Sequence, residues 1–345
     1  MNLQNDRKGF GRTAFLLLTA FSIFVLLIYS ISLISPRVAV QAENFLALPI
    51  RRIVSVLSSL FTLPLTELML LTLPISLPLL LSAISKIDIR RAALISVIII
   101  EILSILYSAT IAIPTLSRTK MSHGGHSLAE NDYISAAEIL VDTVRAFDLP
   151  TEYSFLKICD VATDAVIKYA EKCGMPRAAS SVKPSLIPEI LCGAGILAYY
   201  SFITSEISVN TYQPKYMLAF TVAHEEAHFM GITREDEANL FAFIALSESD
   251  DSYLRYSAAL RGFEYLSSSI YGIAPGKYSD VYSSLSDSAK ADLSKSRKFS
   301  ESQSSGFFGE ISEAANDALI SIRDSRGKDS YSDTAALIVE YLLCN

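Results

Sequence analysis

Residues 220–239 read Phe220-Thr-Val-Ala-His224-Glu225-Glu226-Ala-His228-Phe-Met-Gly231-Ile-Thr-Arg-Glu235-Asp-Glu-Ala-Asn239. The spacing H-E-x-x-H puts His224 and His228 four residues apart, so on a helix both side chains lie on one face. Two neutral imidazoles so placed can bind one zinc ion, and Glu225 then projects toward the open coordination position. A carboxylate there can take a proton from zinc-bound water and pass it to a leaving amine. The stretch therefore predicts a zinc-dependent peptidase with Glu225 as general base.

The residues after the motif predict a turn followed by a second helix. Gly231 is suited to end the motif helix in a left-handed conformation. Thr233 is suited to cap the next helix, with Asp236 three residues on completing a capping box. This arrangement would bring the second helix back toward the two histidines.

A third zinc ligand is expected on that second helix. Glu235 and Asn239 are four residues apart and share a face, which favours Glu235 as the ligand and Asn239 as its supporting partner. Glu237 is the alternative ligand, although its position turns it roughly away from that face. The alternative is that the motif occurs by chance on a solvent-exposed helix. Two of the four histidines in the chain form the motif, which argues against chance.

The same residues resemble a known family. The segments 223–228 and 235–239, with Gly231 between them, are similar to the motif of the bacterial membrane proteins grouped as domain of unknown function family 3810, regarded as zincin-like metallopeptidases of the gluzincin type. Three further segments resemble parts of that family: Leu63-Pro-Leu-Thr-Glu67, Ser201-Phe-Ile-Thr-Ser-Glu206-Ile-Ser-Val-Asn210 and Ser330-Tyr331-Ser-Asp-Thr-Ala-Ala-Leu-Ile-Val. The resemblance implies a membrane-anchored zinc peptidase of unknown substrate. Ser201 and Ser205 depart from it, because proline and glycine are expected there.

The first 118 residues contain three long apolar runs with few charges. Each is long enough to span the hydrocarbon core of a bilayer, which predicts transmembrane helices at about 13–35, 65–84 and 92–114. The segment 53–63 is expected to be interfacial or re-entrant. The predicted architecture is mainly α: a membrane domain over 1–118, then a mostly helical zincin-like domain with a small β element over 119–345.

The charges predict the partners and the location. Lysine and arginine are slightly more numerous on the N-terminal side of the spans, which favours a multi-pass protein of the cell membrane with its catalytic domain outside the cytoplasm. The lipid bilayer and a peptide or protein substrate are the expected partners. A net charge of −7 without a basic stripe argues against nucleic acid.

Two acidic residues interrupt the apolar runs. Glu67 and Glu101 would be transport residues in a transporter with an extracytoplasmic lid. The plainer expectation is that Glu67 lies near the interface and that Glu101 hydrogen-bonds a neighbouring helix.

Residues beyond the motif give weaker predictions. Residues 203–210 are a candidate edge strand for pairing with an extended substrate, with Glu206 and Asn210 as candidate substrate contacts. The alternative is an ordinary buried strand with Glu206 on its exposed face. Tyr331 is a candidate oxyanion donor, although packing is the plainer role.

Four more expectations concern loops and thiols. Residues 175–190 are expected to be loop, and residues 283–305 a solvated segment or flap. His123 and His126 lie in a Gly-rich connector and are a weak candidate for an accessory metal site. The four cysteines lack the C-x-x-C spacing of a zinc site and are either buried thiols or disulfides.

A second function class stays open. The chain can instead be a zinc-binding membrane sensor or assembly protein without peptidase activity, in which the metal only holds two helices together. Retention of Glu225 argues mildly against this alternative, because a structural site has no need of a general base.

Overall fold

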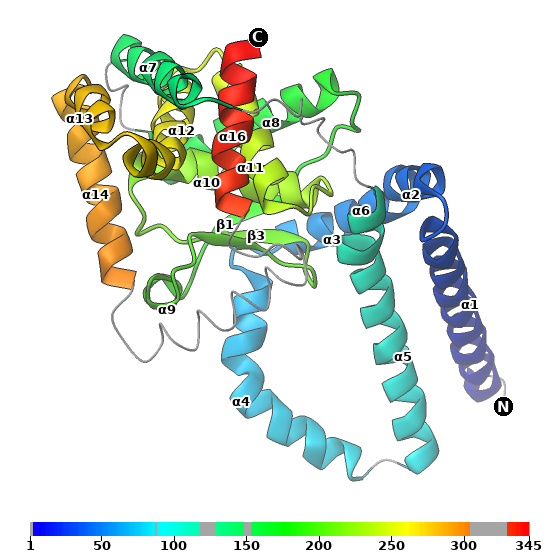
Figure 1. The fold of residues 1–345 in the computed structure, drawn as a ribbon. Helices are drawn as coiled ribbons and strands as arrows, with labels where there is room; N and C mark the ends of the chain where they lie inside the picture. Colours follow the sequence, from blue (N-terminus) through cyan, green and yellow to red (C-terminus); the bar gives the residue numbers. More distant parts are fainter. Residues whose placement is uncertain (1–2, 87, 118–127, 148–152, 304–329, 345) are drawn as a thin grey trace. The chain divides into compact units, whose positions relative to one another are not determined.

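The computed structural model describes residues 3–86, 88–117, 128–147, 153–303 and 330–344. The chain divides into two compact units (Figure 1). The first contains Met1–Arg118 together with Ser201–Ser205, and the second contains Thr119–Tyr200 and Glu206–Asn345. The described residues are mainly helical, with one small sheet.

The first unit contains three helices long and apolar enough to cross a membrane, over Phe15–Ser32, Leu65–Ile84 and Arg91–Thr115. These segments agree with the predicted spans and indicate a membrane protein. They belong to α1 (Leu3–Ser32), α4 (Leu65–Ile84) and α5 (Ile89–Tyr107), the last continuing through a π-helical turn η2 (Ser108–Ala112) into α6 (Ile113–Ser117). The side chains of α4 are largely exposed and apolar, as expected of a helix that faces lipid.

Short helices connect the first two spans. They are α2 (Pro36–Ala42), a second π-helical turn η1 (Glu43–Ala47) and α3 (Leu48–Ser59). Small side chains let η1 and η2 pack closely, with Ala42, Ala47, Ala109 and Ile113 buried together. The fully buried Arg51 pairs with Glu43 and donates a hydrogen bond to the carbonyl of Ala109 at 2.5 Å.

The two acidic residues of the spans are both accounted for. Thr19 on α1 donates a hydrogen bond to Glu101 on α5 at 2.9 Å, which confirms the expected pairing of Glu101 with a neighbouring helix. Glu67 lies in the first turn of α4 and is fully buried.

The second unit begins with α7 (Glu130–Ala146) and α8 (Phe155–Lys172). On α7, Ala136 and Ala137 are buried, whereas Ile139 is exposed. A three-stranded sheet follows from β1 (Ser181–Pro184), β2 (Ala198–Tyr200) and β3 (Glu206–Val209), with α9 (Pro188–Gly193) between β1 and β2. The prediction of a loop over 175–190 holds for residues 175–180 and 185–187 and was wrong for β1 and the start of α9.

The strand order also corrects the prediction that residues 203–210 form an edge strand. It is β1-β3-β2, with β1 parallel and β2 antiparallel to β3. The predicted edge strand is thus the central strand, and β2 and β1 form the edges. Strands of three or four residues carry little periodicity, so their order could not be read from the sequence.

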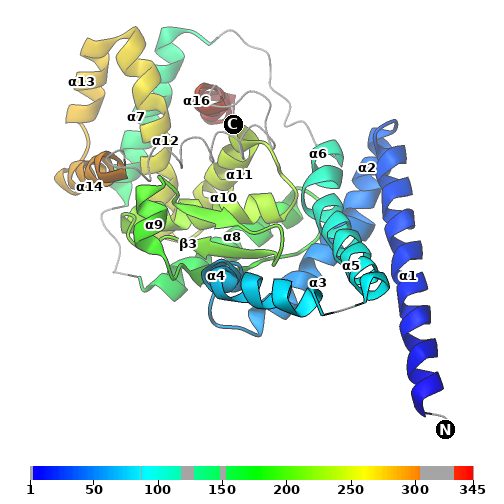
Figure 2. The ribbon, with the colours of Figure 1, turned by 90° about the horizontal axis from the view of Figure 1, so that it is seen from below.

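Helices α10 (Lys215–Phe229) and α11 (Glu235–Ser247) form the centre of the second unit, on one face of the sheet (Figures 1 and 2). Helix α10 contacts α8, α11, α12 (Ser252–Ile273) and the strands β2 and β3. Almost all of its side chains are buried, because it is covered on several sides.

The remaining helices are α13 (Pro275–Ser283), α14 (Asp287–Gln303) and α16 (Ser330–Cys344). Helix α14 replaces most of the predicted solvated flap. Its partly polar inner face is held by Asp292, which accepts hydrogen bonds from Tyr256 at 2.9 Å and Lys295 at 2.8 Å. His123 and His126 lie outside the described residues.

The cysteines are all free thiols. Burial raises the pKa of Cys159 to about 12, with Asp160 and Glu226 adding to the effect. This thiol is therefore protonated and unreactive at neutral pH, which agrees with the expectation of a buried thiol rather than a disulfide.

Candidate metal centre

Helix α10 presents the two histidines of the motif. The helix begins after Pro214, whose lack of an amide hydrogen suits a helix start. His224 and His228 are four positions apart on the helix, and their rings lie 4.6 Å apart between centroids in an edge-to-face arrangement. Both Nε2 atoms approach the same carboxylate, that of Glu235.

Gly231 brings the chain back toward the histidines. It adopts a φ of +99°, the left-handed conformation that glycine permits. The amide of Gly231 donates to the carbonyl of His228, and the amide of Ile232 donates to that of Ala227, each at 3.0 Å. This pair of bonds is a Schellman motif, and it ends α10 as the sequence predicted.

The start of α11 differs from the prediction. Arg234, not Thr233, is the N-cap residue, and the hydroxyl of Thr233 is buried without a hydrogen-bond partner among the described residues. Asp236 pairs with Arg234 through two hydrogen bonds of 3.0 and 2.5 Å. The predicted capping box was wrong because this guanidinium takes the carboxylate instead.

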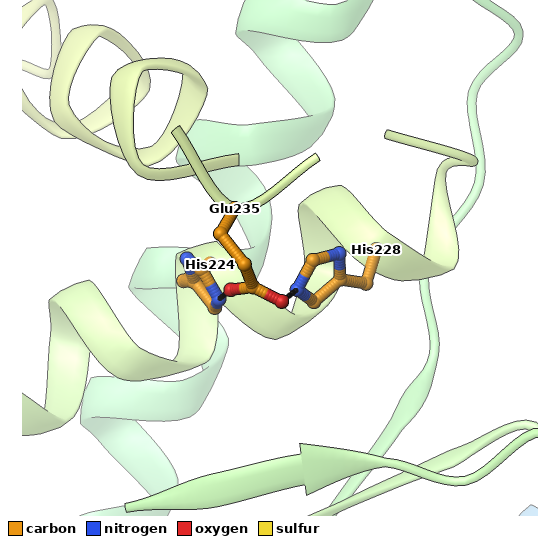
Figure 3. Close-up of side chains that lie close together, drawn as sticks. All are labelled: His224, His228 and Glu235. Carbon is orange, nitrogen blue, oxygen red and sulfur yellow. Dashed lines mark ion pairs between the residues drawn. The ribbon is translucent and has the colours of Figure 1, made fainter. Parts of the chain in front are cut away.

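The structure brings His224, His228 and Glu235 together (Figure 3). One oxygen of Glu235 lies 3.2 Å from Nε2 of His224, and the other lies 3.5 Å from Nε2 of His228. One ligand atom from each residue falls within 4.8 Å of the others. Glu237, the alternative ligand, is directed to Arg234 at 3.2 Å.

The tautomer of His228 suits metal binding. Its Nδ1 lies 2.7 Å from the carbonyl oxygen of Ile232. Since a carbonyl oxygen only accepts, Nδ1 carries the hydrogen and Nε2 keeps its lone pair. This Nε2 is buried and has no hydrogen-bond partner among the described residues. A buried lone pair of this kind calls for a partner such as a metal ion.

The separations also suit zinc. Ligands at 2.0–2.1 Å around a tetrahedral zinc ion lie about 3.3–3.4 Å from one another. The two N–O separations of 3.2 and 3.5 Å fall around that value. Two imidazoles and a carboxylate are also a donor set that zinc accepts in catalytic sites. The three residues therefore fit the metal.

The charge of Glu235 is favoured by its neighbours. Burial acts to raise its pKa, but the two histidines beside it outweigh burial and hold the pKa well below its usual value. Glu235 is therefore an ionised ligand at neutral pH.

Glu225 is directed to the sheet. Its Oε2 accepts a hydrogen bond of 2.8 Å from the backbone amide of Tyr200, the last residue of β2. The Tyr200 ring also packs edge to face on Phe229 of α10, with centroids 5.9 Å apart. Sequence reasoning missed Tyr200, because a backbone amide carries no sequence signal.

The remaining predicted residues serve the fold around the site. Asn239 accepts a hydrogen bond from the hydroxyl of Tyr265 at 2.9 Å and donates one to Thr334 at 3.4 Å. It thus ties α11 to α12 and α16. The sequence offered no signal that would single out Tyr265 among 17 tyrosines.

Glu206 and Asn210 are fully buried. Glu206 pairs with Lys183 of β1 at 2.7 Å, and Asn210 bonds the carbonyl of Ile196 and the amide of Tyr212. Burial argues against direct substrate contact, and it also corrects the alternative of an exposed Glu206. The side chain of Tyr331 lies outside the described residues.

Comparison with known proteins gives one match. No curated protein and no solved structure matches the chain. The model of the family described as "Protein of unknown function (DUF3810)" matches residues 43–339. That range includes two of the three apolar spans and the whole ligand cluster. The chain therefore belongs to the DUF3810 family.

Proposed function

We propose that this protein is a membrane-anchored zinc peptidase with a zincin-like domain. The observation that carries the proposal is the convergence of His224, His228 and Glu235, with separations that suit tetrahedral zinc. Glu225, beside His224 in the motif, supplies the carboxylate that peptide hydrolysis requires. The distribution of lysine and arginine in the sequence favours a catalytic domain outside the cytoplasm.

Zinc held by these residues would supply a Lewis acid that polarises a carbonyl and lowers the pKa of water. The chain's own residues would transfer the proton and orient the groups that take part. Glu225 accepts a proton and returns it to the leaving amine. The Tyr200 amide orients this carboxylate, and the Ile232 carbonyl fixes the tautomer of His228.

The strand order supports one position for the substrate within this proposal. An extended peptide can add to a sheet only at an edge, and β3 is paired on both sides. Of the two edge strands, β2 is the one whose last residue binds Glu225. We therefore expect a peptide substrate beside β2.

A second candidate function rests on the hydrogen bond between the Tyr200 amide and Glu225. Because Glu225 already holds the Tyr200 amide, its presence in the motif can be structural. The protein would then be a zinc-binding sensor or assembly protein in which the metal joins α10 to α11.

One experiment separates the two functions. The full chain, purified in detergent, is assayed for zinc content and for cleavage of a mixed peptide library, alongside Glu225→Gln and His228→Ala. For a peptidase, we expect Glu225→Gln to keep about one zinc and to lose turnover by at least about a thousandfold, as expected when both proton transfer and positioning are removed. His228→Ala should lose both zinc and activity.

The matched control is Glu248→Gln, which removes the carboxylate of the C-cap residue of α11, whose partners include Lys172 and Tyr341. It should retain zinc and activity. Zinc binding without cleavage by the parent protein would favour the second function, and full activity in Glu225→Gln would rule out the proposed mechanism.

A further inference from the structure

The loop between β2 and β3 connects two parts of the chain. Residues Ser201–Ser205 belong to the unit formed by Met1–Arg118. The residue before this loop, Tyr200, belongs to the other unit and donates its amide to Glu225. A single peptide bond thus separates a loop packed in the membrane-spanning unit from the residue that orients the proposed base.

Hydroxyl groups hold the loop to α4. Oγ1 of Thr66, in the first turn of α4, lies 2.6 Å from Oγ of Ser201 and 2.9 Å from Oγ1 of Thr204. The contacts join segments that are 135 and 138 residues apart in the sequence. Ser201 and Thr204 are both buried, so loss of their partner would leave buried hydroxyls to be satisfied elsewhere.

The loop itself is tightly constrained. The carbonyl of Ser201 accepts a bond from the amide of Ser205 at 2.9 Å, and its hydroxyl accepts from the amides of Ile203 and Thr204 at 3.3 Å. Ser205 adopts a φ of +48°, where glycine is favoured. A loop this constrained transmits a displacement at Ser201 to Tyr200 rather than absorbing it.

We propose that Thr66 is a positioning residue for Glu225. By holding Ser201 and Thr204, it fixes the end of β2, and the Tyr200 amide then keeps the Glu225 carboxylate oriented. The inference depends on the proposed function only for the role of Glu225 in catalysis.

The test uses the full chain in lipid nanodiscs and the variants Thr66→Val, Thr66→Ser and Thr72→Val. Valine keeps the shape of threonine but removes the hydroxyl, whereas serine keeps the hydroxyl. Thr72 lies on the same helix, and among the described residues its hydroxyl bonds only the carbonyls of Leu68 and Met69, both on α4. It therefore controls for the loss of any hydroxyl from this helix.

Hydrogen exchange at the Tyr200 amide is the first readout, followed by zinc content and the kcat and KM of peptide cleavage. Loss of one hydrogen-bonded anchor should speed exchange at Tyr200 about tenfold in Thr66→Val. The kcat should fall about tenfold, with KM and zinc content unchanged. Thr66→Ser and Thr72→Val should both behave like the parent.

The outcomes are distinct. Equal Tyr200 exchange in Thr66→Val and Thr72→Val would overturn the inference. A parent that binds zinc but cuts no peptide would overturn the proposed function, while the exchange comparison would still decide the positioning role. If Thr66→Val does not fold, Thr204→Val replaces it, because it removes one of the two contacts from the loop side. A Tyr200 exchange rate unchanged in Thr204→Val would then overturn the inference.

Discussion

At the scale of single residues, the second glutamate of the motif has a role that the motif does not describe. Glu226 is fully buried and accepts hydrogen bonds from the amide of Ser180 at 2.9 Å and from Thr163 at 3.3 Å. Burial raises its pKa to about 7, although these two hydrogen bonds act to lower it. Glu226 thus anchors the chain that leads into β1, at an electrostatic cost.

The raised pKa of Glu226 predicts that the stability of the protein depends on pH. The folded protein holds the Glu226 proton up to about pH 7, whereas the unfolded chain releases it near the ordinary value of 4.5. Stability from Glu226 is therefore present below pH 4.5 and is lost as the pH rises through 7. The free energy of unfolding of metal-free protein should fall by roughly 3 kcal/mol over that range because of this group.

Glu226→Gln is the corresponding test. The variant should be more stable than the parent at pH 8 and not at pH 4.5, as measured by denaturant unfolding of the chelator-treated full chain. Parallel stability curves for the two proteins between these pH values would contradict the prediction.

Single residues also show how far the sequence could predict the site. The spacing of the motif was enough to bring His224, His228 and Glu235 together, because helix geometry and one glycine turn determine their positions. The partners of Asn239 and Glu225 could not be predicted. They come from α12, α16 and the backbone of β2, which reach the site only through the tertiary fold.

At the scale of elements, the turn at Gly231 sets the distance between the ligands of α10 and that of α11. Replacing Gly231 by alanine forces a Cβ into a left-handed conformation, which costs about 1–2 kcal/mol. We expect the turn to relax by shifting Glu235, so that zinc affinity falls about tenfold or more. The measurement is competition for zinc against a chromophoric chelator.

Gly174 provides the control for that variant. It also has a positive φ, +74°, and an added Cβ would meet no atom within 4 Å. Gly174→Ala should therefore lose a similar amount of stability without losing zinc affinity. Equal zinc affinity in both variants would show that the Gly231 turn does not position the ligand.

Elements with long, regular patterns could be predicted, and short or polar ones could not. The spans and helices α10 and α12 follow from apolar length and helical spacing. Strand β1 contains Lys183 and Pro184, and its place is fixed by parallel pairing with β3. Helix α14 is rich in serine and charge, and it is held by polar bonds such as that of Asp292 to Tyr256. Neither element carries the apolar period by which an element is recognised.

At the scale of the whole molecule, the membrane-spanning unit contains a buried ion pair that is costly to break. Arg51 and Glu43 join α3 to η1, and Arg51 also binds the Ala109 carbonyl of η2. Arg51→Met would leave the Glu43 carboxylate without this cation, and we expect a loss of about 3–5 kcal/mol. Thermal unfolding of the full chain in detergent measures the loss.

The double variant Glu43→Leu, Arg51→Met tests the cause. It removes both charges, so most of the stability should return, apart from the hydrogen bond to Ala109. A double variant as unstable as Arg51→Met alone would assign the effect to packing instead of to the uncompensated charge.

The ligand cluster has a further consequence for how the protein assembles. All three candidate ligands fall between residues 224 and 235, so the proposed zinc ion would close a loop of only a few residues, at a small entropic cost. Contacts this local form early in folding. Under the proposed function, zinc would be captured on the nascent chain while α12 and α16 are still being synthesised, and the later helices would then pack around an assembled metal site.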